Sequence, residues 1–151
     1  MTGLVDDVRR RARTVDLARD MCGGSLAGMR VGVLGAAFKP NSDDIRDSPA
    51  LDVALATQRA GAAVRVYDPQ AMDNARVAFP TLAYASSAVD AARDADVVLH
   101  LTEWAEFTAM HPSALSAVVR QRHIVDGRNK LDRELWTRER WTHRTLGRRS
   151  I

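Results

Sequence analysis

The stretch MRVGVLGAAFKP, at residues 29–40, decides the fold of this protein. Apolar and β-branched residues run from Met29 to Leu34 and end at Gly35, a pattern that predicts a short buried strand followed by a tight loop. The chain then stays polar as far as Asp47, so the loop is long. A buried strand that leads into a polar loop is typical of a parallel α/β sheet.

A helix follows this loop. Ser48 is placed to cap its amino end, Pro49 takes the first helical position, and Gly61 ends it. Further strands are expected at residues 63–67, 96–101 and 123–126, and further helices at residues 68–76, 86–93 and 112–122. This alternation predicts βαβ units in a parallel sheet with helices on both faces. Beyond Gly127 the pattern is weaker, and residues 136–149 are expected to form a loose cap or an irregular strand.

Another helix is expected before the sheet, at residues 4–22. Its apolar residues recur every three or four positions, which is the spacing of one helix face. They are Leu4, Val8, Ala12, Val15, Ala18 and Cys22. The arginines among residues 9–13 would then lie largely on the outer side of the helix. The expected fold class is therefore α/β, a three-layer Rossmann-like parallel sheet preceded by an N-terminal helix.

Length and composition fit one folded domain. The 151 residues are 46% hydrophobic and 27% charged, which is average for globular proteins and argues against a disordered, collagenous or coiled-coil chain. The net charge is +3, and residues 120–149 hold ten lysines and arginines against four acidic residues. Two interpretations of this basic segment stay open, a solvated surface and an anion site.

The sequence gives no sign of a membrane, disulfide or metal protein. No apolar stretch approaches the roughly 20 residues that a membrane helix needs, and no secretion signal begins the sequence. The single cysteine, Cys22, cannot form an internal disulfide or supply a zinc cluster, which agrees with a reducing compartment. The histidines lack metal-ligand spacing and are expected at strand ends or on the surface. They are His100, His111, His123 and His143. We therefore expect a cytoplasmic protein without a metal site.

Candidate binding residues follow the strands, because ligands of open parallel sheets bind at the carboxyl ends of the strands. Gly32 and Gly35 would let the backbone approach a phosphate, although their G-x-x-G spacing differs from the G-x-G-x-x-G dinucleotide fingerprint. Phe38 offers a face for a base, Lys39 a positive charge, and Arg128 a planar fork for a phosphate. Together these side chains suggest a nucleotide ligand, although Lys39 could equally be an ordinary surface lysine.

Four motifs carry a resemblance to a known family. They are GAAFKPNSDDIRDSPA at residues 35–50, YDP at 67–69, LTEWAEF at 101–107 and DGRN at 126–129. The chain resembles the C-terminal, UDP-binding domain of the UDP-glucose/GDP-mannose 6-dehydrogenase family over roughly residues 4–129. This resemblance implies that residues 1–25 are the end of the family's long central helix plus a linker, and that residues 26–151 are the UDP-binding domain.

The resemblance also implies roles for single residues. Phe38, Lys39 and Arg128 would bind the UDP-sugar, and Arg46 would reach the NAD held by a neighbouring Rossmann domain. The two aspartates at residues 43–44 would shape the loop. Family members oxidise the sugar C6 alcohol of a nucleotide-sugar to a carboxylate in two NAD-dependent steps, through a thiohemiacetal on a catalytic cysteine.

The family's NAD-binding domain and its cysteine-bearing segment are absent from this sequence. Cys22 would not replace that cysteine, because it falls on the apolar face of a helix and at its carboxyl end, where the helix dipole disfavours a thiolate. We therefore expect a UDP-glucose binding domain without catalytic residues, inactive alone. NAD would act only in the complete enzyme, with a separate NAD-binding chain as one candidate partner and a homo-oligomer as the expected assembly.

Two other functions stay open. The domain could be a non-catalytic remnant that keeps the fold and acts as an interaction or dimerisation module. Nucleic-acid binding through the basic segment is the third hypothesis, which we do not favour, since only Trp136 and Trp141 could supply stacking aromatics there.

Two further side-chain roles follow from position alone. Asp68 follows a strand, where Rossmann folds place a ribose-binding carboxylate, but Asp-Pro is also a helix start, which we favour. Trp104 and Phe107 lie three residues apart on an expected helical turn and should pack against the sheet.

Overall fold

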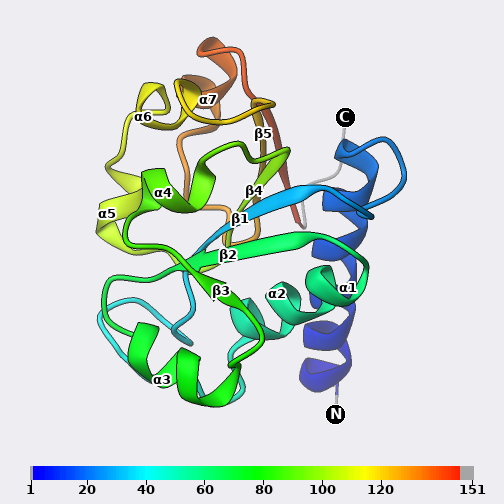
Figure 1. Cartoon of the computed structure of the whole chain (residues 1–151), viewed down its shortest axis with the longest axis vertical. Helices are drawn as coiled ribbons and strands as arrows, with labels where there is room; N and C mark the ends of the chain where they lie inside the picture. The colour runs from blue at the N-terminus through cyan, green and yellow to red at the C-terminus, as the bar shows by residue number, and fades with distance from the viewer. Residues whose placement is uncertain (1, 147–151) are drawn as a thin grey trace.

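The computed structural model describes residues 2–146, with side chains from residue 8 onward. Within these residues six strands form one sheet in the order β3-β2-β1-β4-β5-β6 (Figure 1). The strands are β1 (Arg30–Leu34), β2 (Ala63–Tyr67), β3 (Ala83–Tyr84), β4 (Val97–His100), β5 (His123–Asp126) and β6 (Thr142–Thr145). Every neighbouring pair is parallel, which confirms the predicted sheet. The strand order reverses between β1 and β4, the point at which such sheets bind ligands.

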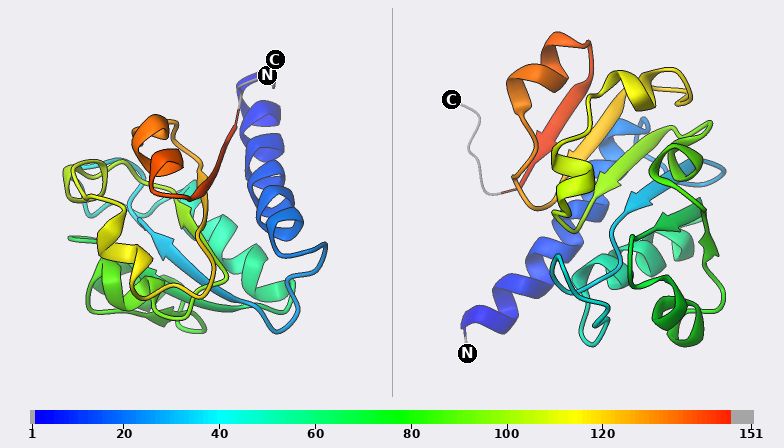
Figure 2. Two further views of the ribbon diagram at one scale, coloured as in Figure 1. Left: turned by 90° about the horizontal axis from the view of Figure 1, so that it is seen from above. Right: turned by 90° about the vertical axis from the view of Figure 1, so that its left-hand side faces the viewer.

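Helices cover both faces of this sheet. In the described part of the chain they are α1 (Thr2–Met21), α2 (Pro49–Arg59), α3 (Met72–Ala78), α4 (Ala88–Ala92), α5 (Ala105–Thr108), α6 (Ser113–Ser116) and α7 (Arg133–Arg138). α1 and α2 lie together on one face, and α4 and α6 lie on the other (Figure 2). The three-layer, Rossmann-like arrangement with an N-terminal helix is therefore confirmed.

The local sequence signals of α2 act as predicted. Ser48 Oγ accepts a hydrogen bond from the Leu51 amide, and Pro49 is the first helical residue. β2 and β5 also have their predicted bounds. The helix expected at residues 112–122 is shorter, because only residues 113–116 form α6.

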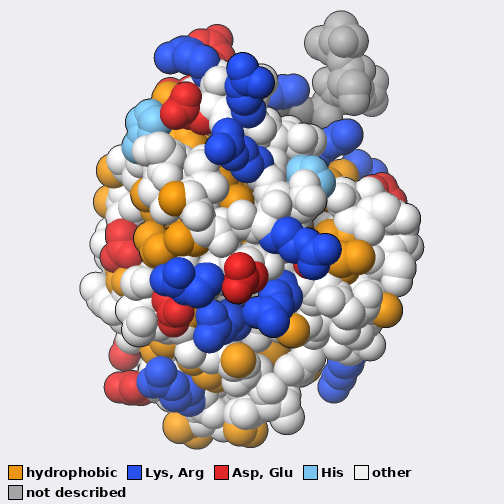
Figure 3. Space-filling model, turned by 45° about the horizontal axis from the view of Figure 1, so that its top comes forward, with side chains coloured by type: hydrophobic (Ala, Val, Ile, Leu, Met, Phe, Trp, Pro, Cys, Tyr) orange, Lys and Arg blue, Asp and Glu red, His pale blue; other side chains and the backbone are white. Residues whose placement is uncertain are grey.

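The segment after Gly127 is more regular than predicted. It forms α7 and the sixth strand, β6, so of the two alternatives the strand is confirmed at residues 142–145 and the loose cap is wrong. Residues 147–149 of that expectation lie outside the described residues. Trp136 of α7 and Trp141 are buried and pack edge to face, with ring centres 4.9 Å apart. These two rings belong to the core and are not available for stacking on bases. On the face shown in Figure 3, basic side chains are interspersed with acidic ones.

The predicted apolar face of α1 is confirmed only in the second half of the helix. Val15 and Ala18 are buried as expected, but Val8 is 59% exposed and Ala12 is exposed as well. Three of the four arginines at residues 9–13 are exposed as predicted, and Arg11 forms an ion pair with Asp52 of α2. Among the described side chains of α1, the prediction is therefore wrong for Val8 and Ala12 alone. No helix of the described residues is long and apolar enough to span a bilayer.

Candidate ligand site at the carboxyl edge of the sheet

The loops that follow the strands are tied together at the carboxyl edge of the sheet. The Thr102 hydroxyl, after β4, donates to the Ala37 carbonyl in the loop after β1, at 2.9 Å. The Gly35 amide donates to the carbonyl of Tyr67, the last residue of β2, at 2.8 Å. The Gly127 amide, after β5, donates to the carbonyl of His100 at 2.9 Å. The predicted candidate residues therefore stand on loops that share one edge.

Asp68 is the centre of this network. Its carboxylate is buried and accepts the amides of Ala36 at 2.8 Å and Ala37 at 2.9 Å. It also accepts the amides of Gln70 and Ala71 and the indole Nε1–H of Trp104, at 2.8 to 3.0 Å. Asp68 therefore caps the turn at residues 69–71. α3 begins only at Met72, its N-cap is Ala71 and no side chain caps it, so the prediction that Asp68 starts this helix is wrong. The five bonds leave Asp68 without an exposed oxygen for a ribose.

The two glycines of the first loop are required for packing. A Cβ on Gly35 would lie 2.5 Å from the backbone nitrogen of Thr102, and the φ angle of Gly35 is +115°. A Cβ on Gly32 would lie 2.5 Å from the carbonyl oxygen of Ala91 in α4. The sequence suggests that both glycines admit a phosphate. Instead, the space beside each is filled by another loop or helix of the same domain.

Phe38 and Lys39 project from the loop after β1. The Phe38 amide donates to the Asp44 carbonyl at 2.8 Å, which closes the loop on itself. Phe38 is nevertheless 49% exposed, which is unusual for a large apolar residue. Lys39 is also exposed and lies near enough to Asp44 to help lower the pKa of that carboxyl. This loop therefore offers an aromatic face beside a positive charge.

Arg128 stands on the loop after β5 and pairs with Glu103, on the loop after β4. Its Nε lies 3.2 Å from Glu103 Oε1, and its Nη2 lies 3.3 Å from Oε2. This contact uses one edge of the guanidinium and leaves the Nη1 end for another anion. The sequence pattern singled out Arg128 but not Glu103, although both lie in the quoted motifs.

Arg46 lies on the loop after β1, the loop of Phe38 and Lys39, and 88% of its side chain is exposed. Its guanidinium donates to the Asp44 carboxylate through Nε at 3.1 Å and Nη2 at 2.9 Å. These hydrogen bonds lower the pKa of Asp44 to about 2. Asp44 thus organises the loop, as the resemblance implied.

A buried cluster that the sequence did not reveal joins the last residues of β4 and β5 to His143 within β6. His100 Nδ1 lies 2.9 Å from Asp126 Oδ1, and His143 Nε2 lies 3.6 Å from Asp126 Oδ2. All three side chains are buried. His100 and His143 were expected at strand ends or on the surface, and the surface alternative is wrong for both. No local signal indicates the cluster, because the three residues meet only in the folded sheet.

Asp126 makes the stability of the domain pH-dependent. Burial alone would raise its pKa, but the imidazoles of His100 and His143 and the amide of Leu131 outweigh burial and hold the pKa well below its usual range. Because an unfolded aspartate titrates near about pH 3.9, this contribution to the free energy of unfolding is complete above about pH 5 and decreases as the pH falls.

We therefore expect urea unfolding to show a steeper loss of stability between about pH 5 and pH 3 in the wild type than in Asp126→Asn. The other carboxylates are common to both proteins, so the difference between the two curves isolates Asp126. Parallel curves would contradict the assignment.

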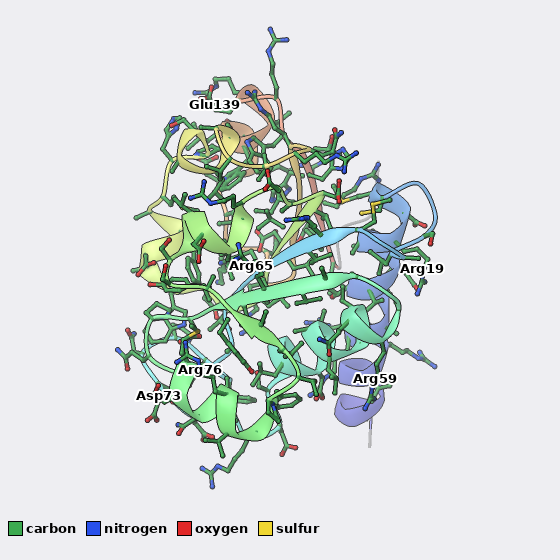
Figure 4. The ribbon with its side chains drawn as sticks, viewed as in Figure 1. Arg19, Arg59, Arg65, Asp73, Arg76 and Glu139 are labelled. Carbon is green, nitrogen blue, oxygen red and sulfur yellow. The ribbon has the colours of Figure 1, made fainter. Side chains whose placement is uncertain are left out.

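The carboxyl edge is an open surface. The hollow beside Arg128, lined also by Arg10, Arg11 and Gly127, holds about 80 Å³. Pockets that enclose a small-molecule ligand hold roughly 300–1,000 Å³. A second hollow, of about 510 Å³, lies at the amino ends of β1 and β2 near Arg65 (Figure 4). It is edged by arginines that pair with acidic residues, such as Arg65 with Asp90 at 3.6 Å. A nucleotide at the carboxyl edge would therefore stay partly uncovered by this domain.

Cys22 follows the last residue of α1 and is partly buried against the core. Burial, with a smaller contribution from the charge of Asp96, raises the pKa of its thiol. A raised pKa disfavours the nucleophilic thiolate. Among the residues from 8 to 146, no three His, Cys, Asp or Glu side chains form a group that could hold a metal ion.

Comparison with known proteins gives one consistent result. Residues 32–133 match the UDP-glucose/GDP-mannose dehydrogenase family, UDP binding domain. UDP-glucose 6-dehydrogenase of Rhizobium meliloti is 40% identical over 97% of this chain, and UDP-glucose 6-dehydrogenase AglM of Haloferax volcanii is 45% identical over 80%. The chain spans only 33% and 27% of these relatives.

A solved structure supports the same family assignment. The UDP-glucose dehydrogenase of Pyrobaculum islandicum is 32% identical and superimposes with a TM-score of 0.72, over 81% of this chain and 27% of that protein. The chain therefore belongs to the UDP-glucose/GDP-mannose dehydrogenase family, in which it corresponds to the UDP binding domain.

Proposed function

We propose that the carboxyl edge of this domain binds the UDP part of a UDP-sugar such as UDP-glucose, for oxidation of the sugar by a complete dehydrogenase. Phe38 would stack on the base, and Lys39 and Arg128 would hold the diphosphate. The observation that carries the proposal is the Thr102 to Ala37 hydrogen bond of 2.9 Å. It ties the loop of Phe38 and Lys39 to the loop of Glu103, the ion-pair partner of Arg128.

The charges of this edge suit a diphosphate. Lys39 contributes an exposed ammonium, whereas Arg128 contributes a guanidinium already oriented by Glu103. An oriented arginine loses less side-chain freedom when it binds an anion, which favours affinity. The exposed aromatic ring of Phe38 would bury apolar surface against the uracil.

NAD does not fit a site within this domain. The carboxylate that follows β2, where Rossmann folds hold a ribose, is Asp68, and it already accepts five N–H groups. We propose instead that the exposed Arg46 reaches an NAD held by a separate NAD-binding domain, on the same or another chain. NAD held there would supply the hydride acceptor for oxidation of the sugar.

The same second domain would cover the open carboxyl edge and bring the sugar to the cofactor. A homo-oligomer is the assembly that we expect for the complete enzyme. Cys22, with its raised pKa, is not suited to be the nucleophile, so this chain alone should bind the nucleotide without oxidising the sugar.

Thermal unfolding with UDP tests the binding proposal. A ligand at about 100 times its Kd stabilises the native state by about 2.7 kcal/mol, which should raise the Tm of a domain of this size by roughly 5–10 °C. Lys39→Ala and Arg128→Ala each remove a charged contact and should cut this shift to about half or less at the same UDP concentration. Arg46→Ala should change it little, because its proposed partner is NAD.

Arg59→Ala is the matched control, since Arg59 is an exposed arginine at the far end of α2 (Figure 4). It should leave the UDP shift unchanged. If UDP raises the Tm no more than sulfate at equal ionic strength, the domain does not bind UDP and the interaction-module function is favoured.

A further inference from the structure

The loop that carries Arg128 is hydrogen-bonded to one buried carboxylate, that of Asp126. Asp126, the last residue of β5, accepts the Arg128 amide through Oδ1 at 3.2 Å. Its Oδ2 accepts the amides of Lys130 at 2.9 Å and Leu131 at 2.8 Å. Asn129, between Arg128 and Lys130, adopts a φ angle of +56°. Three amides of residues 127–131 therefore point to the same side chain, which sets the course of the turn.

Both neighbouring strands contact Asp126, β4 by a hydrogen bond to its carboxylate and β6 by a hydrogen bond to its backbone carbonyl. His100 of β4 lies 2.9 Å from Oδ1, and His143 of β6 lies 3.6 Å from Oδ2. The Thr145 hydroxyl of β6 donates to the Asp126 backbone carbonyl at 2.8 Å. Because the two imidazoles and the carboxylate are buried, neither water nor a surface ion can substitute for them. The orientation of the Asp126 carboxylate therefore fixes the positions of the turn amides that donate to it.

We propose that Asp126, oriented by His100, is a positioning residue that aims Arg128 at the anion of the bound ligand. The inference rests on the proposed UDP binding, and it assigns Asp126 no contact with the ligand. A buried carboxylate costs free energy that an apolar side chain would not. Here it fixes three amides of the turn that no apolar residue could fix.

Arg128 is then held at both ends. Asp126 holds its backbone, and Glu103 holds the Nε and Nη2 edge of its guanidinium. The Nη1 end is the part left for a phosphate. Since the turn is ordered before the ligand arrives, the ordering cost of binding is reduced. Release of the turn should therefore weaken UDP binding even while Arg128 is present.

Asp126→Asn tests this role, because an amide cannot accept hydrogen bonds from every donor around it. UDP affinity measured by calorimetry should fall about tenfold, the loss that corresponds to one hydrogen bond to a charged group. The matched control is Val125→Ala, a buried β5 neighbour whose truncation opens a cavity but leaves the turn intact. It should keep the affinity of the wild type.

A double variant separates positioning from a general loss of structure. If Asp126 acts through Arg128, Asp126→Asn combined with Arg128→Ala should bind UDP no more weakly than Arg128→Ala alone. Additive losses would overturn the proposal, as would equal affinities of Asp126→Asn and Val125→Ala.

Amide hydrogen exchange of the unliganded chain keeps the test independent of the proposed function. The amides of Arg128, Lys130 and Leu131 should exchange faster in Asp126→Asn but not in Val125→Ala. If the wild type fails to bind UDP, the proposed function fails, and unchanged exchange at these amides would separately overturn the positioning role. Should Asp126→Asn not fold, His100→Phe removes one partner of Oδ1 while keeping a ring beside Phe107, and faster exchange at Arg128 is again the expected result.

Discussion

Asp68→Ala is expected to lower the free energy of unfolding by about 4 kcal/mol, the effect of removing one partner from a buried, fully bonded charge. The substitution leaves five N–H donors without an acceptor, among them the amides of Ala36 and Ala37 and the indole of Trp104. Each unpaired buried donor carries a cost of roughly 1–3 kcal/mol, although these costs do not add fully. Because a domain of this size is stable by about 5–15 kcal/mol in all, this is a large share.

Urea unfolding at neutral pH measures this loss. Asp68→Asn keeps one acceptor oxygen and should lose about half as much as Asp68→Ala. The control is Asp73→Ala on α3, whose side chain is fully exposed and pairs only with Arg76 at 3.4 Å among the described residues (Figure 4). An exposed ion pair of this kind contributes about 0–1 kcal/mol. Equal losses in Asp68→Ala and Asp73→Ala would refute the central role of Asp68.

Gly35→Ala is expected to lower the free energy of unfolding by about 3 kcal/mol or more. Its Cβ would lie 2.5 Å from the Thr102 backbone nitrogen and 2.6 Å from the Thr102 Cβ, so the loops after β1 and β4 would have to separate. The φ angle of +115° adds strain for any residue other than glycine. A forced fit of one extra carbon in packed surroundings costs roughly 1–3 kcal/mol by itself.

Gly24→Ala separates the two contributions. Gly24 has a φ angle of +102°, but no atom of the described residues lies within 4 Å of the place that its Cβ would take. This variant should therefore show the backbone strain alone, about 1–2 kcal/mol. The excess loss in Gly35→Ala, measured by urea unfolding, reports the contact with Thr102. If both variants lose the same stability, the close contact between the two loops has no energetic weight.

Much of the fold could be predicted because its signals are local. The strands at residues 63–67 and 123–126 are continuous runs of suitable residues, and Ser48 and Pro49 mark the start of α2 without help from the rest of the chain. β3 could not be predicted in this way, since a two-residue strand has no periodicity of its own. The ion pair of Arg11 in α1 with Asp52 in α2 could not be predicted for a related reason, because it joins residues far apart in sequence.

For the candidate site, too, local features could be predicted from the sequence and long-range contacts could not. The sequence by itself determined the parallel sheet, the family, and which loops carry Phe38, Lys39 and Arg128, because residue type and spacing are properties of short segments. Only the tertiary structure decided what holds those loops, namely Asp68 beneath the first and Asp126 beneath the last. A buried carboxylate is stable only when donors surround it. Some of these donors are local, such as the amides of Lys130 and Leu131 at Asp126. Others come from distant parts of the chain, namely the Ala36 and Ala37 amides and the Trp104 indole at Asp68 and the His100 imidazole at Asp126, and they assemble only when the sheet has formed.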